Sequence, residues 1–187
     1  MSSFTVQMAN VVVTGANRGI GLAMIKEFLK DKSIANVFAA HRNTADTKAL
    51  RSIKDARLHL LEMDILYDEE IYDSMKKVEA IVGNKGVDIL VNNAGVMYDY
   101  DTDGNVLRKL MCLQMESNAA SHLVVTQTFL PLLRMAARTG GKALVINLTG
   151  SLASITNCKG KTARNATLYQ MSKAALNMMS RSLGMDL

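Results

Sequence analysis

The chain has 187 residues, of which 49% are hydrophobic and 21% are charged, a composition typical of a globular domain with a buried core. Its apolar runs have the length of strands, and no basic stretch precedes an apolar run at the start. The sequence therefore predicts no membrane span and no secretory signal. The net charge of +5 comes from basic residues spread along the chain, so we expect no nucleic-acid partner.

Cysteine and histidine usage argues against a disulfide framework and against a metal site. Cys112 and Cys158 lie far apart, and His41, His59 and His122 are scattered without the spacing of zinc ligands. Two isolated cysteines fit a reducing, cytoplasmic environment. We therefore expect no bound metal and interpret the three histidines as structural.

Short apolar runs alternate with amphipathic helical patterns along the whole chain. Strands are expected at residues 10–15, 36–41, 57–64, 87–95 and 141–150. Helices are expected at residues 20–32, 44–55, 69–83, 106–138 and 168–187. This alternation predicts a doubly wound α/β fold, in which a parallel sheet of about five strands carries helices on both faces. Because no linker or repeat divides the sequence, residues 1–187 are expected to form a single Rossmann-like domain.

A glycine-rich turn, TGANRGIG, joins the first expected strand to the first expected helix. It places Gly15, Gly19 and Gly21 where a backbone can approach a pyrophosphate and where a helix N-terminus offers amide donors. Tight turns use glycine for other reasons as well. In this position of a βαβ unit, however, the three glycines favour dinucleotide binding.

From this turn onward the sequence resembles the classical short-chain dehydrogenase/reductase family, whose turn reads T-G-x-x-x-G-x-G. The other segments follow in the family's order: Asp64 ends the third strand, NNAG occupies 92–95, Asn118 opens a long helix, and Tyr169 and Lys173 form Tyr-x-x-x-Lys. The segments GNKGVDILVNNAGV and SKAALNMMSRSLGMDL are most similar to sniffer-type carbonyl reductases and C-factor-like proteins. The order of five segments, rather than any single one, carries the resemblance.

The resemblance implies a nicotinamide cofactor. In NAD enzymes of this fold an acidic residue usually ends the second strand, whereas here that strand runs into Arg42. Arg42 and Arg18 can hold a 2′-phosphate, so we expect NADP(H); two solvated surface arginines are the alternative. The residues that the resemblance places at the cofactor are Gly15, Asn17, Arg18, Gly19, Ile20, Gly21, Arg42, Asp64, Ile65, Asn92, Ala94, Gly95, Tyr169 and Lys173.

Tyr169 and Lys173 lie four residues apart in an expected helix and therefore share one face. A phenol, whose pKa is ordinarily about 10, needs a nearby cation to favour its phenolate near neutral pH. The resemblance implies reduction of a ketone, aldehyde or quinone to an alcohol by hydride transfer, with Tyr169 as the proton donor. It places Asn118 in a proton relay, and a helix N-cap is a compatible structural role.

The catalytic serine is the weakest match to the family. The family reads N-x-S-S after the fifth strand, whereas this chain reads Asn147-Leu-Thr149-Gly150-Ser151. Gly150 falls at the position of the serine, with Thr149 before it, Ser151 after it and Ser154 further along. We assign the role to Ser151.

Counterparts of the family's sixth and seventh strands and of its substrate-covering segment are absent from the sequence. We therefore expect a truncated member whose fifth strand is an open apolar edge. Three interpretations stay open: a carbonyl reductase of reduced activity, a non-enzymatic NADP-binding protein that acts through partner contacts, and an inactive fragment. The expected partner is a small carbonyl substrate, and both a homodimer and a monomer stay open.

Overall fold

The structure is a computed structural model that describes residues 8–105, 107–140, 142–157 and 166–187, so Cys158 lies outside the described residues. It contains two compact units, Met1–Asn93 with Val125–Ile146 and Ala94–Val124 with Asn147–Leu187. That the whole chain forms a single domain stays a prediction.

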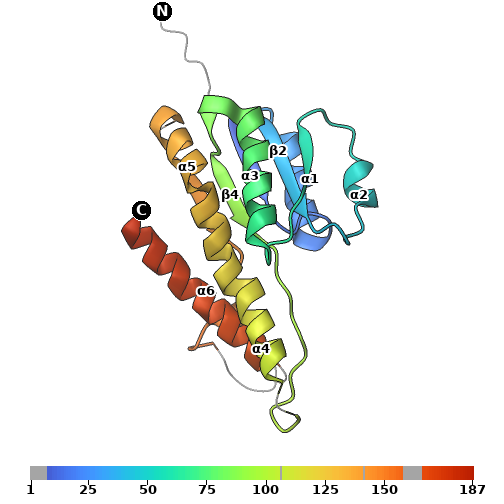
Figure 1. The fold of residues 1–187 in the computed structure, drawn as a ribbon, viewed down its shortest axis with the longest axis vertical. Coiled ribbons are helices and arrows are strands. Elements are labelled where there is room, and N and C mark those ends of the chain that lie inside the picture. The colour runs from blue at the N-terminus through green and yellow to red at the C-terminus, as the bar shows by residue number, and fades with distance from the viewer. Residues whose placement is uncertain (1–7, 106, 141, 158–165) are drawn as a thin grey trace, which may run out of the picture. The chain divides into compact units, whose positions relative to one another are not determined.

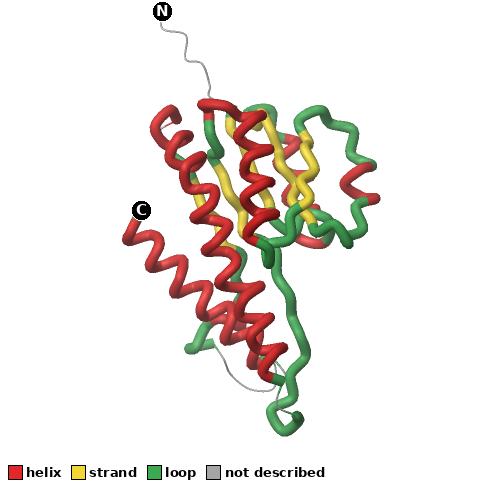
Figure 2. The backbone as a smooth tube through the Cα atoms, viewed as in Figure 1, coloured by secondary structure: helices red, strands yellow, loops and turns green. Residues whose placement is uncertain are grey.

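The first unit is built on a parallel sheet with the strand order β3-β2-β1-β4-β5 (Figure 2). The five strands are β1 Ala9–Val13, β2 Ile34–His41, β3 Leu58–Glu62, β4 Ile89–Asn92 and β5 Leu144–Asn147. The register places Val12 of β1 between Phe38 of β2 and Leu90 of β4. The predicted doubly wound fold is confirmed.

Helices lie on both faces of this sheet, with α3 in front of it and α1 behind it in Figure 1. The helices before β4 are α1 Gly19–Lys30, α2 Lys48–Arg51, α3 Asp68–Val82 and the 3-10 turn η1 Gly83–Lys85. The later ones are α4 Arg108–Met115, the π-helical segment η2 Glu116–Ala120, α5 Ser121–Gly140, the 3-10 turn η3 Ser151–Ala153 and α6 Thr167–Asp186.

The predicted order of elements is confirmed, although several elements are shorter than predicted. The strand predicted at residues 87–95 is observed only at Ile89–Asn92, because the residues after Asn92 leave the sheet. The predicted helix 44–55 is the single turn α2, which Leu50 alone anchors in the core. The helices predicted across residues 106–138 are observed as α4, η2 and α5, and the helical hydrogen-bond pattern changes within η2.

The core of the first unit lies between α1 and the central strands. Val11, Val12 and Val13 of β1 are all completely buried, as expected for a parallel strand that is covered on both faces. Ile25 of α1 packs into the same cluster. At the edge of the sheet, by contrast, Leu144 of β5 is 52% exposed, which agrees with the apolar edge expected there.

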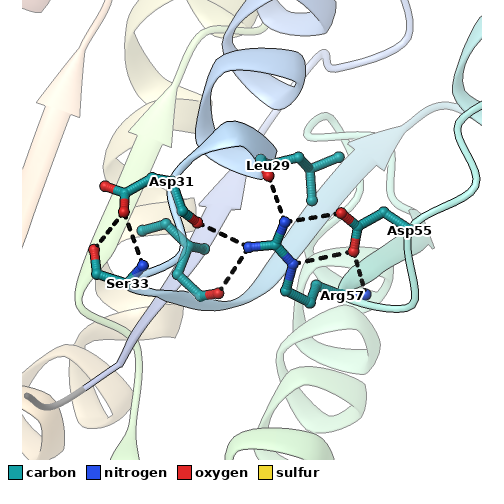
Figure 3. Close-up of polar contacts among 6 residues, drawn as sticks. Leu29, Asp31, Ser33, Asp55 and Arg57 are labelled. Atoms are coloured by element: carbon teal, nitrogen blue, oxygen red, sulfur yellow. Dashed lines mark hydrogen bonds and ion pairs between the residues drawn. The ribbon is translucent and has the colours of Figure 1, made fainter.

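Arg57, just before β3, forms several polar contacts at the edge of the sheet opposite β5 (Figure 3). Its guanidinium donates hydrogen bonds to the carbonyl oxygens of Leu29, Asp31 and Ile34. It also pairs with the carboxylate of Asp55 at 2.8 Å. One side chain thereby joins the end of α1, the start of β2 and the loop that leads into β3.

A chain of polar side chains crosses the strands near their amino ends. His59 of β3 contacts Asn36 Oδ1 at 2.9 Å, Asn36 Nδ2 donates to Asn10 Oδ1 at 2.8 Å, and Asn10 Nδ2 donates to the Gly86 carbonyl at 2.8 Å. Asn10 is completely buried. Because these contacts pair side chains of β1, β2 and β3, the chain of polar groups favours one register over a slipped one.

The second unit consists of α4, η2, the first turn of α5, η3 and α6, with the long loop that follows β4 (Figure 2). Helix α6 packs against α4, η2 and η3. Across the described ranges of the chain, no helix is both long and apolar enough to cross a membrane.

Candidate active site

The glycine-rich turn of the first unit has the backbone conformation that its sequence predicts. Gly15 and Gly19 have φ angles of 63° and 55°, in the left-handed region that favours glycine. A Cβ atom on Gly21 would lie 2.4 Å from the Gly15 carbonyl oxygen and 2.6 Å from Asn93 Nδ2. Gly21 therefore has no room for a side chain where the turn meets the start of α1.

The ends of β1 and β4 are tied together beside this turn. The Asn93 side chain donates to the carbonyl oxygens of Thr14 at 2.8 Å and Gly15 at 3.1 Å. The Asn93 amide donates to Thr14 Oγ1 at 3.0 Å. Strand order reverses between β1 and β4, and ligands of open α/β sheets bind at such switch points.

Two arginines stand where the sequence places a cofactor phosphate. Arg18 immediately precedes α1, Arg42 immediately follows β2, and both are exposed. Neither side chain forms an ion pair with any residue that the structure describes. Asn17, in contrast, donates to the Asp46 carbonyl at 3.3 Å. The two guanidinium groups are therefore accessible to an anion.

The remaining first-unit candidates are partly occupied by structural contacts. Asp64 Oδ1 accepts from the Leu66 amide at 3.1 Å, and Ile65 is buried. Asn92 is completely buried and donates to Thr126 Oγ1 at 3.0 Å. The Asn92 side chain thus joins β4 to α5 by a hydrogen bond.

In the second unit, Asn118 holds the loop that follows β4. Its Oδ1 accepts from the Val96 amide at 2.8 Å, and its Nδ2 donates to the Val96 carbonyl at 2.8 Å and to Ser172 Oγ at 3.0 Å. The predicted helix N-cap is wrong, because Asn118 lies inside η2 with helical residues on both sides. Its side chain satisfies a distant loop instead of its own helix.

Tyr169 and Lys173 lie on one face of α6, as their spacing predicts. The Lys173 ammonium is 5.9 Å from the centroid of the Tyr169 ring. It is only 4% exposed and donates to the Leu148 carbonyl at 2.7 Å, and burial lowers the pKa of its ammonium. Ser172 connects Asn118 to the backbone of α6, because its hydroxyl accepts from Asn118 Nδ2 and donates to the Tyr169 backbone carbonyl at 2.8 Å.

The backbone at Gly95 lies within this group. A Cβ atom at Gly95 would be 3.1 Å from Asn118 Oδ1 and 3.7 Å from Lys173 Nζ. The second unit therefore brings four candidates together: Gly95, Asn118, Tyr169 and Lys173.

The serine position stays a prediction. Ser151 begins η3 and is exposed, and no hydrogen bond of its hydroxyl to another described residue is present. Ser154 Oγ accepts from the Asn157 amide at 3.2 Å within its own turn. Gly150 has extended backbone, and a Cβ atom there would meet nothing within 4 Å. The loop could therefore carry a side chain at position 150.

Sequence reasoning missed two polar residues of this group. Ser172 is the residue before Lys173 and is completely buried. His122, interpreted above only as structural, contacts the Ala94 carbonyl at 2.8 Å. Its position one helical turn after Asn118 was the available signal. No cluster of metal-ligating side chains occurs in the described ranges.

Taken separately, each unit has side chains and backbone groups whose chemistry suits one part of a nicotinamide dinucleotide. In the first unit, the glycine turn opens a helix N-terminus toward an anion, and two unpaired arginines flank the ends of β1 and β2. In the second unit, a phenol and an ammonium share one face of α6, and an amide contacts the same helix through Ser172. A phenol beside a cation can donate and recover a proton.

Comparison with known proteins agrees with this geometry. The family described as short chain dehydrogenase matches residues 9–187. The solved structure of Sniffer from Caenorhabditis elegans superposes with a TM-score of 0.91 at 40% identity, covering 96% of this chain and 79% of that chain. NADPH bound carbonyl reductase from chicken fatty liver gives a TM-score of 0.90 at 29% identity, covering 96% of this chain and 71% of that chain.

Among curated proteins, human 17-beta-hydroxysteroid dehydrogenase type 2 is 33% identical over 180 residues. The match covers 95% of this chain and 43% of the human protein. The chain thus spans less than half the length of that relative.

Proposed function

Because the chain belongs to the short chain dehydrogenase family, we propose that it is an NADPH-dependent reductase of a small carbonyl compound, such as a ketone, aldehyde or quinone. The observation that carries this proposal is the Tyr169–Lys173 pair, in which the Lys173 ammonium lies 5.9 Å from the centroid of the Tyr169 ring. Asn118 and Lys173 both lie near Gly95, beside this pair. Similarity to a carbonyl reductase whose structure contains NADPH supports the choice of cofactor.

The chain's residues have distinct tasks in this proposal. The bound cofactor supplies a hydride. Tyr169 donates its hydroxyl proton to the carbonyl oxygen, and Lys173, as a cation, favours the phenolate that remains. Asn118 is proposed to relay the replacement proton, and Ser151 to hold the carbonyl oxygen.

Preference for NADPH is proposed to come from Arg18 and Arg42. A guanidinium can bind the 2′-phosphate through two hydrogen bonds, whereas a carboxylate repels it. Arg42→Asp is therefore expected to weaken NADPH binding far more than NADH binding, as measured by fluorescence titration with each cofactor. Equal losses for both cofactors would count against this assignment.

Turnover is tested with purified protein, NADPH and a panel of ketones, aldehydes and quinones, by following NADPH oxidation. Tyr169→Phe is the matched variant, since it removes only the hydroxyl. The proposal predicts that this variant still binds NADPH and loses turnover about 100-fold or more. Turnover that persists in Tyr169→Phe would remove the tyrosine from the mechanism.

Gly150 favours a second candidate function, an NADP-binding protein without turnover. The residue offers no hydroxyl where the resemblance expects a serine. Binding of NADPH without oxidation against the whole panel would support this second function over the first.

We also propose that the protein forms a homodimer and that it is located in the cytoplasm. Met171, Met178 and Met185 are exposed at intervals of seven residues on α6, so they form one apolar stripe that a second copy could cover. Light scattering after size-exclusion chromatography distinguishes a dimer from a monomer. A single monomeric species at high concentration would remove the dimer from the proposal.

A further inference from the structure

His122 is the one buried titratable group of the second unit, in its described part, that the proposed mechanism does not use. It lies in the first turn of α5, is completely buried, and directs Nε2 at the Ala94 carbonyl oxygen, 2.8 Å away. A carbonyl oxygen only accepts hydrogen bonds, so the proton must be on Nε2.

The surroundings keep this imidazole neutral. The pKa of His122 is lowered to about 4, chiefly by burial; the hydrogen bond to Ala94 raises it, and the Lys173 charge lowers it. At neutral pH the ring is therefore an uncharged donor. It can hold a carbonyl oxygen without adding a second positive charge beside Lys173.

His122 and Asn118 act on consecutive peptide groups of one loop. His122 holds the Ala94 carbonyl, and Asn118 holds both the amide and the carbonyl of Val96. The two side chains are four residues apart and the π-helical segment η2 ends between them. Gly95, which has no side chain to restrict its backbone, lies between the two fixed groups.

We propose that His122 is a positioning residue of the cofactor site, which fixes the Ala94–Gly95 peptide group through its Nε2 hydrogen bond. The inference rests on the proposed function, because Ala94 and Gly95 are assigned to the cofactor there. Without the donor, the Ala94 carbonyl loses its partner on α5, and the peptide group can rotate about its flanking bonds. The cost falls on cofactor binding rather than on the proton transfer from Tyr169.

The test compares His122→Phe, which keeps a ring but has no donor, with His122→Gln, whose amide nitrogen reaches about as far as Nε2. NADPH affinity is measured by fluorescence titration of the 187-residue chain. His122→Phe is expected to weaken binding about 2- to 10-fold, the effect of one neutral hydrogen bond, and His122→Gln to restore it. His59→Phe, a matched histidine of the first unit, is expected to leave the affinity unchanged.

A second measurement does not depend on cofactor binding or turnover. The amide 15N shift of Gly95 reports on the hydrogen bond to the Ala94 carbonyl, so it should move in His122→Phe and return in His122→Gln. The imidazole 15N signals of the wild type should show a neutral ring protonated on Nε2 at pH 6.

These measurements separate the inference from the proposed function. If the wild type binds no NADPH, the proposed function fails, while the Gly95 shift still decides whether His122 fixes the loop. Equal Gly95 shifts or equal affinities in the Phe and Gln variants would overturn the inference. A wild-type imidazole protonated on Nδ1 would overturn it as well, and that result requires no variant to fold.

Discussion

Replacement of Gly21 by alanine tests the closed glycine turn most directly. The new Cβ atom would lie 2.4 Å from the Gly15 carbonyl oxygen and 2.6 Å from Asn93 Nδ2. A Cβ atom normally lies about 3.4 Å or more from an atom that it contacts, so the turn and α1 must separate by about 1 Å. The nearer atom belongs to the backbone and cannot rotate away as a flexible side chain could.

The expected change in the free energy of unfolding follows from two opposing effects. Forcing an additional methyl group into a packed site typically costs about 1–3 kcal/mol. Alanine is favoured over glycine inside a helix by about 1 kcal/mol, and position 21 lies in α1. Gly21→Ala should therefore destabilise the protein by about 0–2 kcal/mol.

Gly184→Ala is the matched control, because Gly184 also lies in a helix and a Cβ atom there would meet nothing within 4 Å. Gly184→Ala gains the helix propensity of alanine without a steric clash. The free energies of unfolding of the two variants should therefore differ by about 1–3 kcal/mol. Urea unfolding followed by circular dichroism measures that difference. NADPH titration should show weaker binding only for Gly21→Ala, and the emission is easily assigned to the cofactor because the chain contains no tryptophan.

Equal unfolding free energies for Gly21→Ala and Gly184→Ala would refute the reasoning, because the close contacts of the new Cβ atom at position 21 would then have no energetic cost. Reduced stability of Gly21→Ala with unchanged NADPH affinity would separate the turn from the cofactor site. That result would leave the packing argument intact and refute the assignment of the turn to the cofactor.

Four further predictions concern the fold and the serine position. Arg57→Ala should lower the midpoint of thermal unfolding, because three carbonyl oxygens and Asp55 lose their common donor. Arg57 lowers the pKa of the Asp55 carboxyl from 3.8 to about 2, so the ion pair stabilises the fold fully at pH values above 3.8, and this stabilisation is lost as pH falls through about 2. The unfolding free energies of wild type and Asp55→Asn should therefore converge near pH 2. A difference that stays constant with pH would contradict this. Asn10→Val should lower the free energy of unfolding by about 1–3 kcal/mol, measured in urea, because the half-buried Asn36 amide and the buried Gly86 carbonyl lose their partner; an unchanged value would remove the polar chain from the stabilising interactions. Gly150→Ser fits the loop without a clash and should raise kcat for carbonyl reduction, whereas an unchanged kcat would show that the oxygen is held elsewhere.

The motifs of the candidate site were visible in the sequence because each is local. The glycine turn needs only a strand, a bend and a helix in succession, and Tyr169 and Lys173 need only one helical turn between them. Both were predicted, and the structure confirms the turn conformation and the shared face. Asn118 was also identified, but its predicted capping role was wrong because η2 continues the helix through it.

The contacts that organise the site could not be predicted, because they join residues that are distant in sequence. Asn118 meets Val96 across 22 residues and Ser172 across 54. Lys173 meets Leu148 across 25 residues, and His122 meets Ala94 across 28. No local pattern states which helical face will lie against which loop.

The sequence by itself therefore determined the alternating α/β order, the doubly wound class and the identity of the chemical groups. These depend on hydrophobic period and turn chemistry, which act over a few residues. Only the tertiary structure decided that Gly21 has no room for a side chain while Gly150 has ample room. It also decided that a histidine interpreted as structural holds the loop beside Gly95. Both follow from packing between distant segments, where the spacing of atoms, and not the order of residues, sets what is allowed.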